Sequence, residues 1–344
     1  MAENLLEIRD LKVNFGTPYG DVQAVRGVSW ELSAGETLAI VGESGCGKTV
    51  SCQSIMGLLN TPPAKITSGN VMFEGQDLLQ KSDKEMENYR GKELSMIFQD
   101  SMTSLNPTMR IGRQLCEGII KHRKVNRKEA EKIAVDMLRM VRMPNPEQAM
   151  KRYPHTMSGG QRQRVMIAMA LSCNPKVLFA DEPTTALDVT VQAQILDIMD
   201  DMKKRLGTAI VLITHDLGVV AKMADRINVM YAGEIVERGT ADDVFYNPKH
   251  PYTWGLLGST PDRIESRKEK LYSIPGSPPD LFAPPAGCAF AARCEYCMGA
   301  CLKTSPPEFE LGNGHKAACW LLDQRAKPVM PPIFDNEKAV NDNA

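Results

Sequence analysis

A phosphate-binding loop pattern constrains this sequence more than any other feature. Residues Gly42–Thr49 read GESGCGKT and fit the pattern G-x-x-x-x-G-K-[ST]. The apolar run 38–41 before the loop predicts a buried strand, and residues 50–59 after it predict a helix that only Gly57 weakens. A strand, a glycine-rich turn and a helix in this order predict an α/β fold in which backbone N–H groups approach phosphate oxygens at a helix N-terminus.

The side chains of this loop fit nucleotide binding. Lys48 is expected to reach the β- and γ-phosphates, and the Thr49 hydroxyl is expected to ligate Mg²⁺. The alternative is a glycine-rich turn that binds nothing, and the strand-like and helix-like flanks favour the nucleotide over it. The residues expected to contact the nucleotide here are Gly42, Glu43, Ser44, Gly45, Cys46, Gly47, Lys48, Thr49 and Val50.

Length and composition limit the class of protein. The chain has 344 residues, which predicts one large α/β unit and something smaller, and its 43% hydrophobic content allows a sizeable core. Forty-one Lys and Arg residues against 42 Asp and Glu leave no global basic field that would steer the protein to nucleic acid. The start of the chain, 1–4, predicts no secretion signal, and no run approaches the roughly 18 apolar residues of a membrane span.

The hydrophobic pattern alternates between strands and helices. Residues 105–170 turn helical, with a capping pattern at Asn126 and Glu129 and a break at Pro144 and Pro146. Alternation of this kind predicts a mainly parallel sheet with an inserted helical region. After residue 246, Pro, Gly and Cys become frequent and predict a separate loop-rich appendage, whereas the twenty methionines predict adaptable core filling. The expected strands are 5–15, 22–32, 38–41, 69–75, 94–98, 177–180 and 209–214, and a further helix is expected at 191–206.

Several motifs downstream of the loop closely resemble the ATP-binding cassette family. They are Gln99, the pentapeptide 157–161 (MSGGQ), the strand and acidic pair 177–182 (VLFADE), the tripeptide 186–188 (ALD) and His215. In the pentapeptide Met157 replaces the usual Leu, which exchanges one apolar residue for another. The resemblance covers about residues 5–250. The segments 247–253 and 287–319 are similar to the ATPases of bacterial oligopeptide and dipeptide importers.

The resemblance implies roles for the residues at the strand ends. Asp181 would hold Mg²⁺ through its water shell, and Glu182 would be the general base for the water that attacks the γ-phosphate. His215 would hydrogen-bond the γ-phosphate, and Gln99 would contact Mg²⁺ and the attacking water. The segment 100–107 would lie near the transmembrane partner. Without the resemblance, an acidic pair and a lone histidine at strand ends are more often structural.

The resemblance also implies that a second subunit completes the site. The signature residues Ser158, Gly159, Gly160 and Gln161 would grip the γ-phosphate held by the opposite subunit, with Asp188 in the neighbouring loop. That arrangement is a head-to-tail dimer with ATP between the subunits. A helix cap without any ligand is the alternative for the signature. Phe15 is the expected adenine-stacking aromatic, with Tyr19 as second choice, and both could also be surface aromatics.

The family implies a P-loop NTPase core, mainly a parallel sheet, with an antiparallel β subdomain and an inserted helical subdomain at about 100–170. It also implies a boundary near residue 250, between an ATPase domain (1–250) and a C-terminal region (251–344). The implied function is ATP hydrolysis that drives peptide import. The implied partners are two membrane permeases, a second homologous ATPase and an extracytoplasmic binding protein, at the cytoplasmic face of the inner membrane, with no nucleic acid. Alternatives are a soluble cassette ATPase acting on nucleic acid or ribosomes, and an ATP-binding module without turnover.

Five of the nine cysteines crowd into the C-terminal segment, whereas Cys46, Cys52, Cys116 and Cys173 are scattered. A reducing compartment disfavours disulfides and favours a metal site. The spacings Cys294-x₂-Cys297 and Cys297-x₃-Cys301 suit Zn²⁺, and unligated thiols are a further alternative. The importer resemblance instead implies a [4Fe–4S] cluster, with Cys297 as a departure from the pattern. The ligands it implies are Cys288, Cys294, Cys301 and Cys319.

Overall fold

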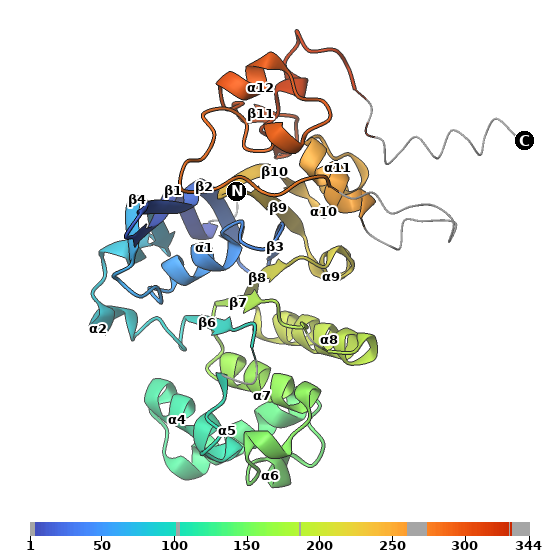
Figure 1. Cartoon of the computed structure of the whole chain (residues 1–344). Helices are drawn as coiled ribbons and strands as arrows, with labels where there is room; N and C mark the ends of the chain where they lie inside the picture. The colour runs from blue at the N-terminus through green and yellow to red at the C-terminus, as the bar shows by residue number, and fades with distance from the viewer. Residues whose placement is uncertain (1–3, 101–103, 186, 260–273, 330, 332–344) are drawn as a thin grey trace, which may run out of the picture.

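Two β-sheets form the framework of the computed structural model, which describes residues 4–100, 104–185, 187–259, 274–329 and 331 (Figure 1). An antiparallel sheet has the strand order β2-β1-β4-β5, and a larger sheet has the order β11-β12-β10-β9-β3-β8-β7-β6. The strands are β1 (Asn4–Thr17), β2 (Gly20–Ser33), β3 (Thr37–Val41), β4 (Ala64–Phe73), β5 (Gln76–Asp77), β6 (Leu94–Ile97), β7 (Val177–Asp181), β8 (Ala209–Thr214), β9 (Arg226–Tyr231), β10 (Glu234–Thr240), β11 (Phe309–Glu310) and β12 (Lys316–Ala317).

The centre of the larger sheet is parallel. Strand β3 lies between β8 and β9, and β7 lies between β8 and β6. These strands are short apolar runs buried on both faces, as a parallel sheet covered by helices requires. Val41 pairs with Thr214 and Asp181 pairs with Ile213, so the carboxyl ends of β3, β8 and β7 meet at one edge. The predicted parallel sheet and antiparallel β subdomain are both confirmed.

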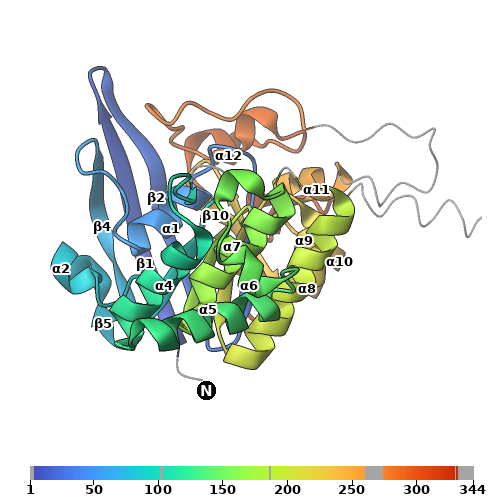
Figure 2. The ribbon, with the colours of Figure 1, turned by 90° about the horizontal axis from the view of Figure 1, so that it is seen from below.

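The predicted helical insertion is confirmed. Helices α4 to α7 gather at the end of the molecule opposite the C-terminal region, which is coloured orange to red (Figure 1), and they lie in front when the molecule is seen from below (Figure 2). The helices are α1 (Lys48–Ile55), α2 (Asp83–Met86), α4 (Ile111–Arg123), α5 (Arg127–Met140), α6 (Pro146–Ala149), α7 (Gly159–Leu171), α8 (Val189–Leu206), α9 (Leu217–Met223), α10 (Ala241–Tyr246), α11 (Pro251–Gly258) and α12 (Gly299–Lys303), with short 3₁₀ turns at Leu78–Gln80, Pro154–Thr156, Ala291–Arg293 and Trp320–Leu322.

Local chemistry sets the helix ends. The Asn126 side chain accepts a hydrogen bond of 3.0 Å from the backbone N–H of Glu129 and caps α5, as the sequence predicted. Helix α1 ends at Ile55, four residues before the expected end. Gly57 adopts a left-handed φ of 61°, the conformation that commonly follows a helix C-terminus. The expectation of a helix to residue 59 was therefore wrong, because the glycine ends the helix rather than weakening it.

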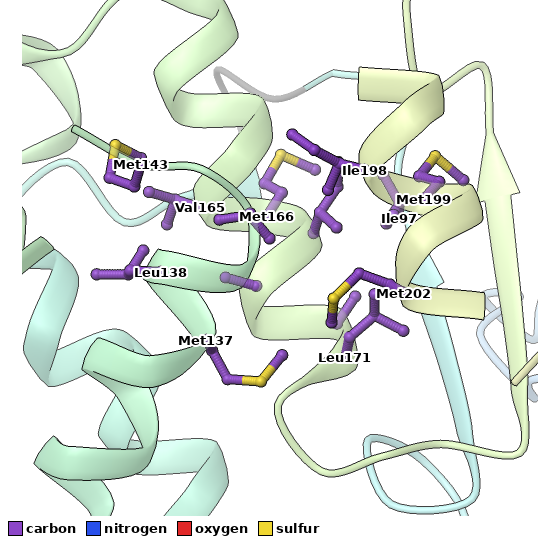
Figure 3. Close-up of a cluster of buried hydrophobic side chains, with 14 of the residues drawn as sticks. Ile97, Met137, Leu138, Met143, Val165, Met166, Leu171, Ile198, Met199 and Met202 are labelled. Carbon is purple, nitrogen blue, oxygen red and sulfur yellow. The ribbon is translucent and has the colours of Figure 1, made fainter. Parts of the chain in front are cut away.

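Methionines fill the core between the helical insertion and the larger sheet. Figure 3 shows Met137 on α5, Met166 on α7 and Met202 on α8 among buried aliphatic side chains. Unbranched thioether side chains adapt to irregular gaps, so they suit the contact between a sheet and helices that approach it at several angles. The prediction that methionine serves as core filling is confirmed. In the described parts of the chain, no helix is both long enough and apolar enough to cross a membrane.

The C-terminal region is attached to the rest of the protein by strand pairing. Strand β12 pairs antiparallel with β10, where Ala317 lies opposite Glu237, and β11 adds a further short strand. Tyr252 and Phe290 are buried in the same apolar cluster as strands β3 and β9. The segment is loop-rich, as predicted, but it is not a separate appendage. Its own apolar residues are too few for a core, so it uses the edge of the main sheet instead.

A buried carboxylate anchors this attachment. Glu237 of β10 accepts hydrogen bonds from the backbone N–H groups of Lys249 (2.7 Å) and His250 (3.0 Å), and it lies 2.9 Å from Nε2 of His315. Both Glu237 and His315 are almost completely shielded from solvent. A buried carboxylate is tolerated when its lone pairs are satisfied in this way, and its partners then depend on it.

We expect Glu237→Ala to lower the free energy of unfolding by about 3 kcal/mol, because it leaves a buried histidine and two backbone N–H groups without their hydrogen-bond acceptor. Thermal and urea unfolding of the purified chain measure the change. The control is Glu310→Ala, which removes an exposed carboxylate from strand β11 at the edge of the same sheet. Equal stability of the two variants would contradict the anchor.

Candidate functional site

The glycines of the loop 42–49 are required by close backbone contacts. Gly42 and Gly47 have φ angles of 153° and 101°, which other residues rarely adopt. A Cβ atom on Gly42 would lie 2.1 Å from the carbonyl oxygen of Met230, and one on Gly47 would lie 2.4 Å from that of Ala24. The space around Gly45 is open. The loop is therefore packed against the protein at both ends and free in its middle, where a phosphate group can approach.

Lys48 is held inside the loop by backbone oxygens. Its Nζ donates hydrogen bonds to the carbonyls of Gly42 (2.7 Å) and Glu43 (2.9 Å) and lies 3.6 Å from Sγ of Cys46. Only 7% of Lys48 is exposed. No carboxylate of the described residues forms an ion pair with this buried ammonium group, so the carbonyls take the place of water. The same loop thus positions the cation that an anionic ligand needs.

The loop is joined to strand β7 by Thr49 and Asp181. The Thr49 hydroxyl donates a hydrogen bond of 3.0 Å to Oδ1 of Asp181. Burial raises the pKa of Asp181 above its usual value, and the hydrogen bond from Thr49 only partly offsets that effect. A hydroxyl and a desolvated carboxylate side by side are hard oxygen ligands, and Mg²⁺ prefers such ligands. The donor set therefore fits the predicted Mg²⁺ position.

Three side chains converge on the carboxylate of Glu182. Gln99 donates from Nε2 to Oε2 (2.9 Å), and the Thr185 hydroxyl donates to the same oxygen (2.8 Å). Nδ1 of His215 lies 2.9 Å from the other oxygen, Oε1. The structure thus brings the three predicted residues Glu182, His215 and Gln99 together. Residues 101–103, which follow Gln99 and were expected near a membrane partner, and Ala186 lie outside the described part of the chain.

The environment of Glu182 keeps its carboxyl group ionised. Burial alone would raise its pKa, but hydrogen bonds from His215 and Thr185 outweigh burial and lower the pKa below the usual value. The residue also adopts a φ of 45° at the end of β7, and its N–H donates to the Ile213 carbonyl of the adjacent strand β8 (2.8 Å). A non-glycine residue held in this conformation has a fixed carboxylate direction. The geometry suits a proton acceptor.

The signature residues and Asp188 lie side by side at two helix N-termini. Ser158 caps α7 and shares a reciprocal capping box with Gln161. Asp188 caps α8 and accepts a hydrogen bond of 2.9 Å from the N–H of Val191. A Cβ atom on Gly160 would lie only 2.7 Å from Val191, so the glycine is what allows the two helix starts to approach. Val189, at the start of α8, is 84% exposed and faces solvent in this single chain.

The two candidate adenine-stacking aromatics lie on the first hairpin. Phe15 of β1 is paired with Val22 of β2 and Ala64 of β4, and its ring packs partly against the core. Tyr19 lies at the turn between β1 and β2 and is 93% exposed. Phe15 is the better fixed of the two, because two strands hold its backbone. No ring of the described residues is assigned to adenine by this geometry alone.

The C-terminal cysteines interact electrostatically with one another. The pKa of Cys288 is raised to about 11 and the pKa values of Cys294 and Cys319 to about 12, mainly by burial and to a smaller extent by the neighbouring Cys301 thiol. The backbone N–H two residues after each of the three hydrogen-bonds its sulfur, which lowers the pKa. Among the described residues, no group of three or more His, Cys, Asp or Glu side chains is arranged to hold a metal ion.

Three residues that contact the site were not predicted. Thr185 binds the Glu182 carboxylate, the Tyr252 hydroxyl accepts from the N–H of Glu43, and Arg293 forms an ion pair with Glu43. The sequence carries a weak signal for Thr185, three residues after the acidic pair. Tyr252 and Arg293 lie more than two hundred residues after the loop, and only the tertiary structure brings them to it.

Comparisons with known proteins agree with this geometry. A family described as "ABC transporter" matches residues 25–185, and one described as "Oligopeptide/dipeptide transporter, C-terminal region" matches residues 236–301. The chain is 56% identical to the oligopeptide transport ATP-binding protein OppD of Bacillus subtilis over 95% of this chain and 92% of the relative. It is 54% identical to the dipeptide transport ATP-binding protein DppD of the same organism, over 94% of this chain and 97% of the relative.

Solved structures show the same fold. A dimeric ATP-binding cassette in a post-hydrolysis state with ADP and Pi superposes with a TM-score of 0.62 at 26% identity, covering 69% of this chain and 98% of the neighbour. A protein from Clostridium perfringens, part of an ABC transporter complex, superposes with a TM-score of 0.61 at 28% identity, over 71% of this chain and 92% of that one.

We expect Thr185→Val to raise the pKa of the Glu182 carboxyl group, because it removes a donor that stabilises the charged form. The carboxyl group would then take up its proton at a higher pH than in the wild type. Carbon-13 NMR of labelled glutamate side chains measures the titration, with Glu182→Gln assigning the signal. Thr67→Val, on the exposed strand β4, is the matched control and should leave the titration unchanged.

Proposed function

The chain belongs to the ATP-binding cassette family, among the ATP-binding proteins of oligopeptide and dipeptide transporters, and on that premise we propose how its residues carry out the reaction. It is an ATP-hydrolysing subunit of a peptide importer. The observation that carries the proposal is the convergence of Gln99, Thr185 and His215 on the Glu182 carboxylate beside the phosphate loop. Peptide-transport relatives favour this function over action on nucleic acid.

The phosphate groups of ATP occupy the open middle of the loop. When ATP binds, the ammonium group of Lys48 leaves the carbonyls of Gly42 and Glu43 and donates hydrogen bonds to the β- and γ-phosphate oxygens. These bonds are stronger because the phosphate oxygens carry negative charge. Thr49 and Gln99, with Asp181 acting through the metal's water shell, would hold Mg²⁺, which would neutralise charge on the triphosphate. Phe15 stacks on the adenine ring.

Glu182 accepts the proton of the attacking water. Its lowered pKa keeps it ionised at neutral pH, as a general base requires. Gln99 and His215, already at 2.9 Å from its two oxygens, direct the carboxylate and the water toward the γ-phosphate. Electrostatic preorganisation of this kind costs no rearrangement at the moment of reaction.

A second subunit completes each site. Ser158, Gly159, Gly160 and Gln161, with Asp188 beside them, bind the γ-phosphate held in the loop of the opposite subunit. The free N–H groups at the start of α7 are suited to an anion. The exposed Val189 supports a contact surface here. The partner is a second homologous ATPase, so the active unit is a head-to-tail heterodimer.

The remaining partners follow from the transport function. Two membrane permeases carry the peptide, and an extracytoplasmic binding protein delivers it. The ATPase associates peripherally with the cytoplasmic face of the inner membrane through the permeases. Residues 1–250 form the ATPase domain, with the helical subdomain at about 100–170, and residues 251–344 form the importer-type C-terminal region.

The C-terminal cysteines hold a [4Fe–4S] cluster through Cys288, Cys294, Cys301 and Cys319, and the cluster has a structural role. Support comes from the backbone N–H groups that already point at three of the sulfurs, and from the closeness of these thiols, because a bound metal would offset the repulsion between their thiolate forms. Such N–H groups stabilise thiolates in metal sites. A Zn²⁺ ion that includes Cys297 is the alternative, since the Cys297 thiol also interacts with that of Cys301.

We expect Glu182→Gln to reduce ATP turnover of the assembled transporter by about 10²–10⁴-fold while ATP binding persists, because the amide keeps the shape but cannot accept the proton. Steady-state phosphate release and equilibrium ATP binding measure the two effects. Glu131→Gln, an exposed position on α5, is the control and should leave both unchanged. Near-normal turnover in Glu182→Gln would remove this residue from the mechanism.

We expect anaerobically purified protein to be brown, to absorb broadly at about 400 nm and to contain about four irons per chain. Cys294→Ser should abolish the colour, whereas Cys297→Ser should retain the iron. If the protein is colourless, holds stoichiometric zinc and loses it in Cys297→Ser, the zinc alternative is correct instead.

A further inference from the structure

An arginine of the C-terminal region reaches into the phosphate loop. Arg293, at the end of the 3₁₀ turn Ala291–Arg293, forms a two-point ion pair with the carboxylate of Glu43. Its Nη1 and Nη2 lie 2.7 and 3.0 Å from the two oxygens of Glu43, which is 250 positions away in the sequence. Bidentate pairs between a guanidinium group and a carboxylate are among the strongest charge-assisted hydrogen bonds, and they fix orientation as well as distance.

Arg293 itself has little freedom to move. Its Nε donates to the Pro275 carbonyl (2.8 Å), its Nη1 lies 3.2 Å from the hydroxyl of Tyr231, and the guanidinium carbon lies over the rings of Tyr231 (5.7 Å) and Phe290 (5.9 Å). Only 5% of its side chain is exposed. A cation so deeply buried requires a carboxylate partner, and here that partner is a residue of the phosphate loop.

A second contact holds the same loop residue from its backbone. The N–H of Glu43 donates a hydrogen bond of 2.8 Å to the hydroxyl of Tyr252. Tyr252 is completely buried and packs against Tyr231 and Phe290, with ring centroids 4.5 and 5.4 Å away. The side chain and the backbone of Glu43 are therefore both attached to C-terminal residues, and the loop conformation depends on them.

The position of Glu43 makes this attachment matter for ATP. Glu43 is the acidic residue of the loop 42–49, and its carbonyl oxygen lies 2.9 Å from Nζ of Lys48. A Glu43 carboxylate left without its partner would add an uncompensated negative charge to the loop that binds the triphosphate, and like charges in a partly buried site repel one another. The ion pair removes this repulsion.

We infer that Arg293 is a positioning residue for the phosphate loop: by neutralising and anchoring Glu43 it keeps uncompensated negative charge out of the loop that binds ATP, and it makes ATP affinity depend on the docked C-terminal region. The inference rests on the ATPase function proposed above. It does not depend on which metal the cysteines hold, since the arginine and its partners are protein groups.

The test uses the assembled transporter with its partner ATPase and permeases. We expect Arg293→Met to raise KM for ATP about tenfold and to leave kcat within about twofold, because binding is weakened while Glu182 is untouched. Equilibrium ATP binding should weaken by the same factor. Adding Glu43→Gln to this variant removes the uncompensated charge, so the double variant should recover most of the lost affinity. A purely structural contact would lower the amount of folded protein and kcat instead of raising KM alone.

Arg293→Gln is a second variant, which keeps a polar amide but loses the charge and the two-point contact, and it should show the same rise and the same rescue. Arg325→Met is the matched control, because Arg325 lies in the same region but is exposed, and its ion pair within the described part of the chain is with nearby Asp323. The inference is overturned if folded Arg293→Met or Arg293→Gln keeps the wild-type KM, or if Glu43→Gln gives no rescue. A wild-type complex without ATPase activity would instead overturn the proposed function.

Discussion

The parallel order of strands β3, β8 and β7 is the constraint on which the site depends. Because neighbouring parallel strands end at the same edge, the phosphate loop after β3, His215 after β8 and the acidic pair at the end of β7 are delivered to one place. The hydrogen bond from Thr49 to Asp181 joins two of these strand ends directly. No single strand end holds enough groups for catalysis, and the sheet assembles them from segments far apart in the sequence.

Among the electrostatic contacts that link the C-terminal region to the rest of the protein, two involve deeply buried side chains. At one, Glu237 receives His315 and two backbone donors at the edge of the larger sheet. At the other, Arg293 pairs with Glu43 in the phosphate loop. Buried ionic contacts contribute specificity of docking more than net stability, because desolvation offsets much of their attraction. The region that carries the cysteines is therefore held in register with the nucleotide site.

The opposite end of the molecule has a different character. There the helical insertion packs on the sheet through methionines and aliphatic side chains, a contact that tolerates small changes of angle. The signature residues at the start of α7 lie on this insertion, next to the start of α8. A rigid phosphate loop and an adaptably packed signature are suited to a site that closes between two subunits around ATP.

The sequence by itself determined the alternation of strands and helices and the loop 42–49, because short apolar runs and fixed local spacings encode these features. The roles proposed for Glu182 and His215 came instead from the resemblance to a known family, since a strand end with an acidic or imidazole side chain does not by itself specify a reaction. The sequence also indicated the Asn126 cap, although it misjudged the end of α1, where the outcome depended on the backbone conformation of Gly57. Only the tertiary structure decided the pairing of β12 with β10 and the contacts of Thr185, Tyr252 and Arg293 with the loop and its base. The reason is physical. Local sequence patterns indicate which residues are buried and which cap a helix, whereas contacts between segments far apart in the sequence depend on how the strands are arranged in the sheet.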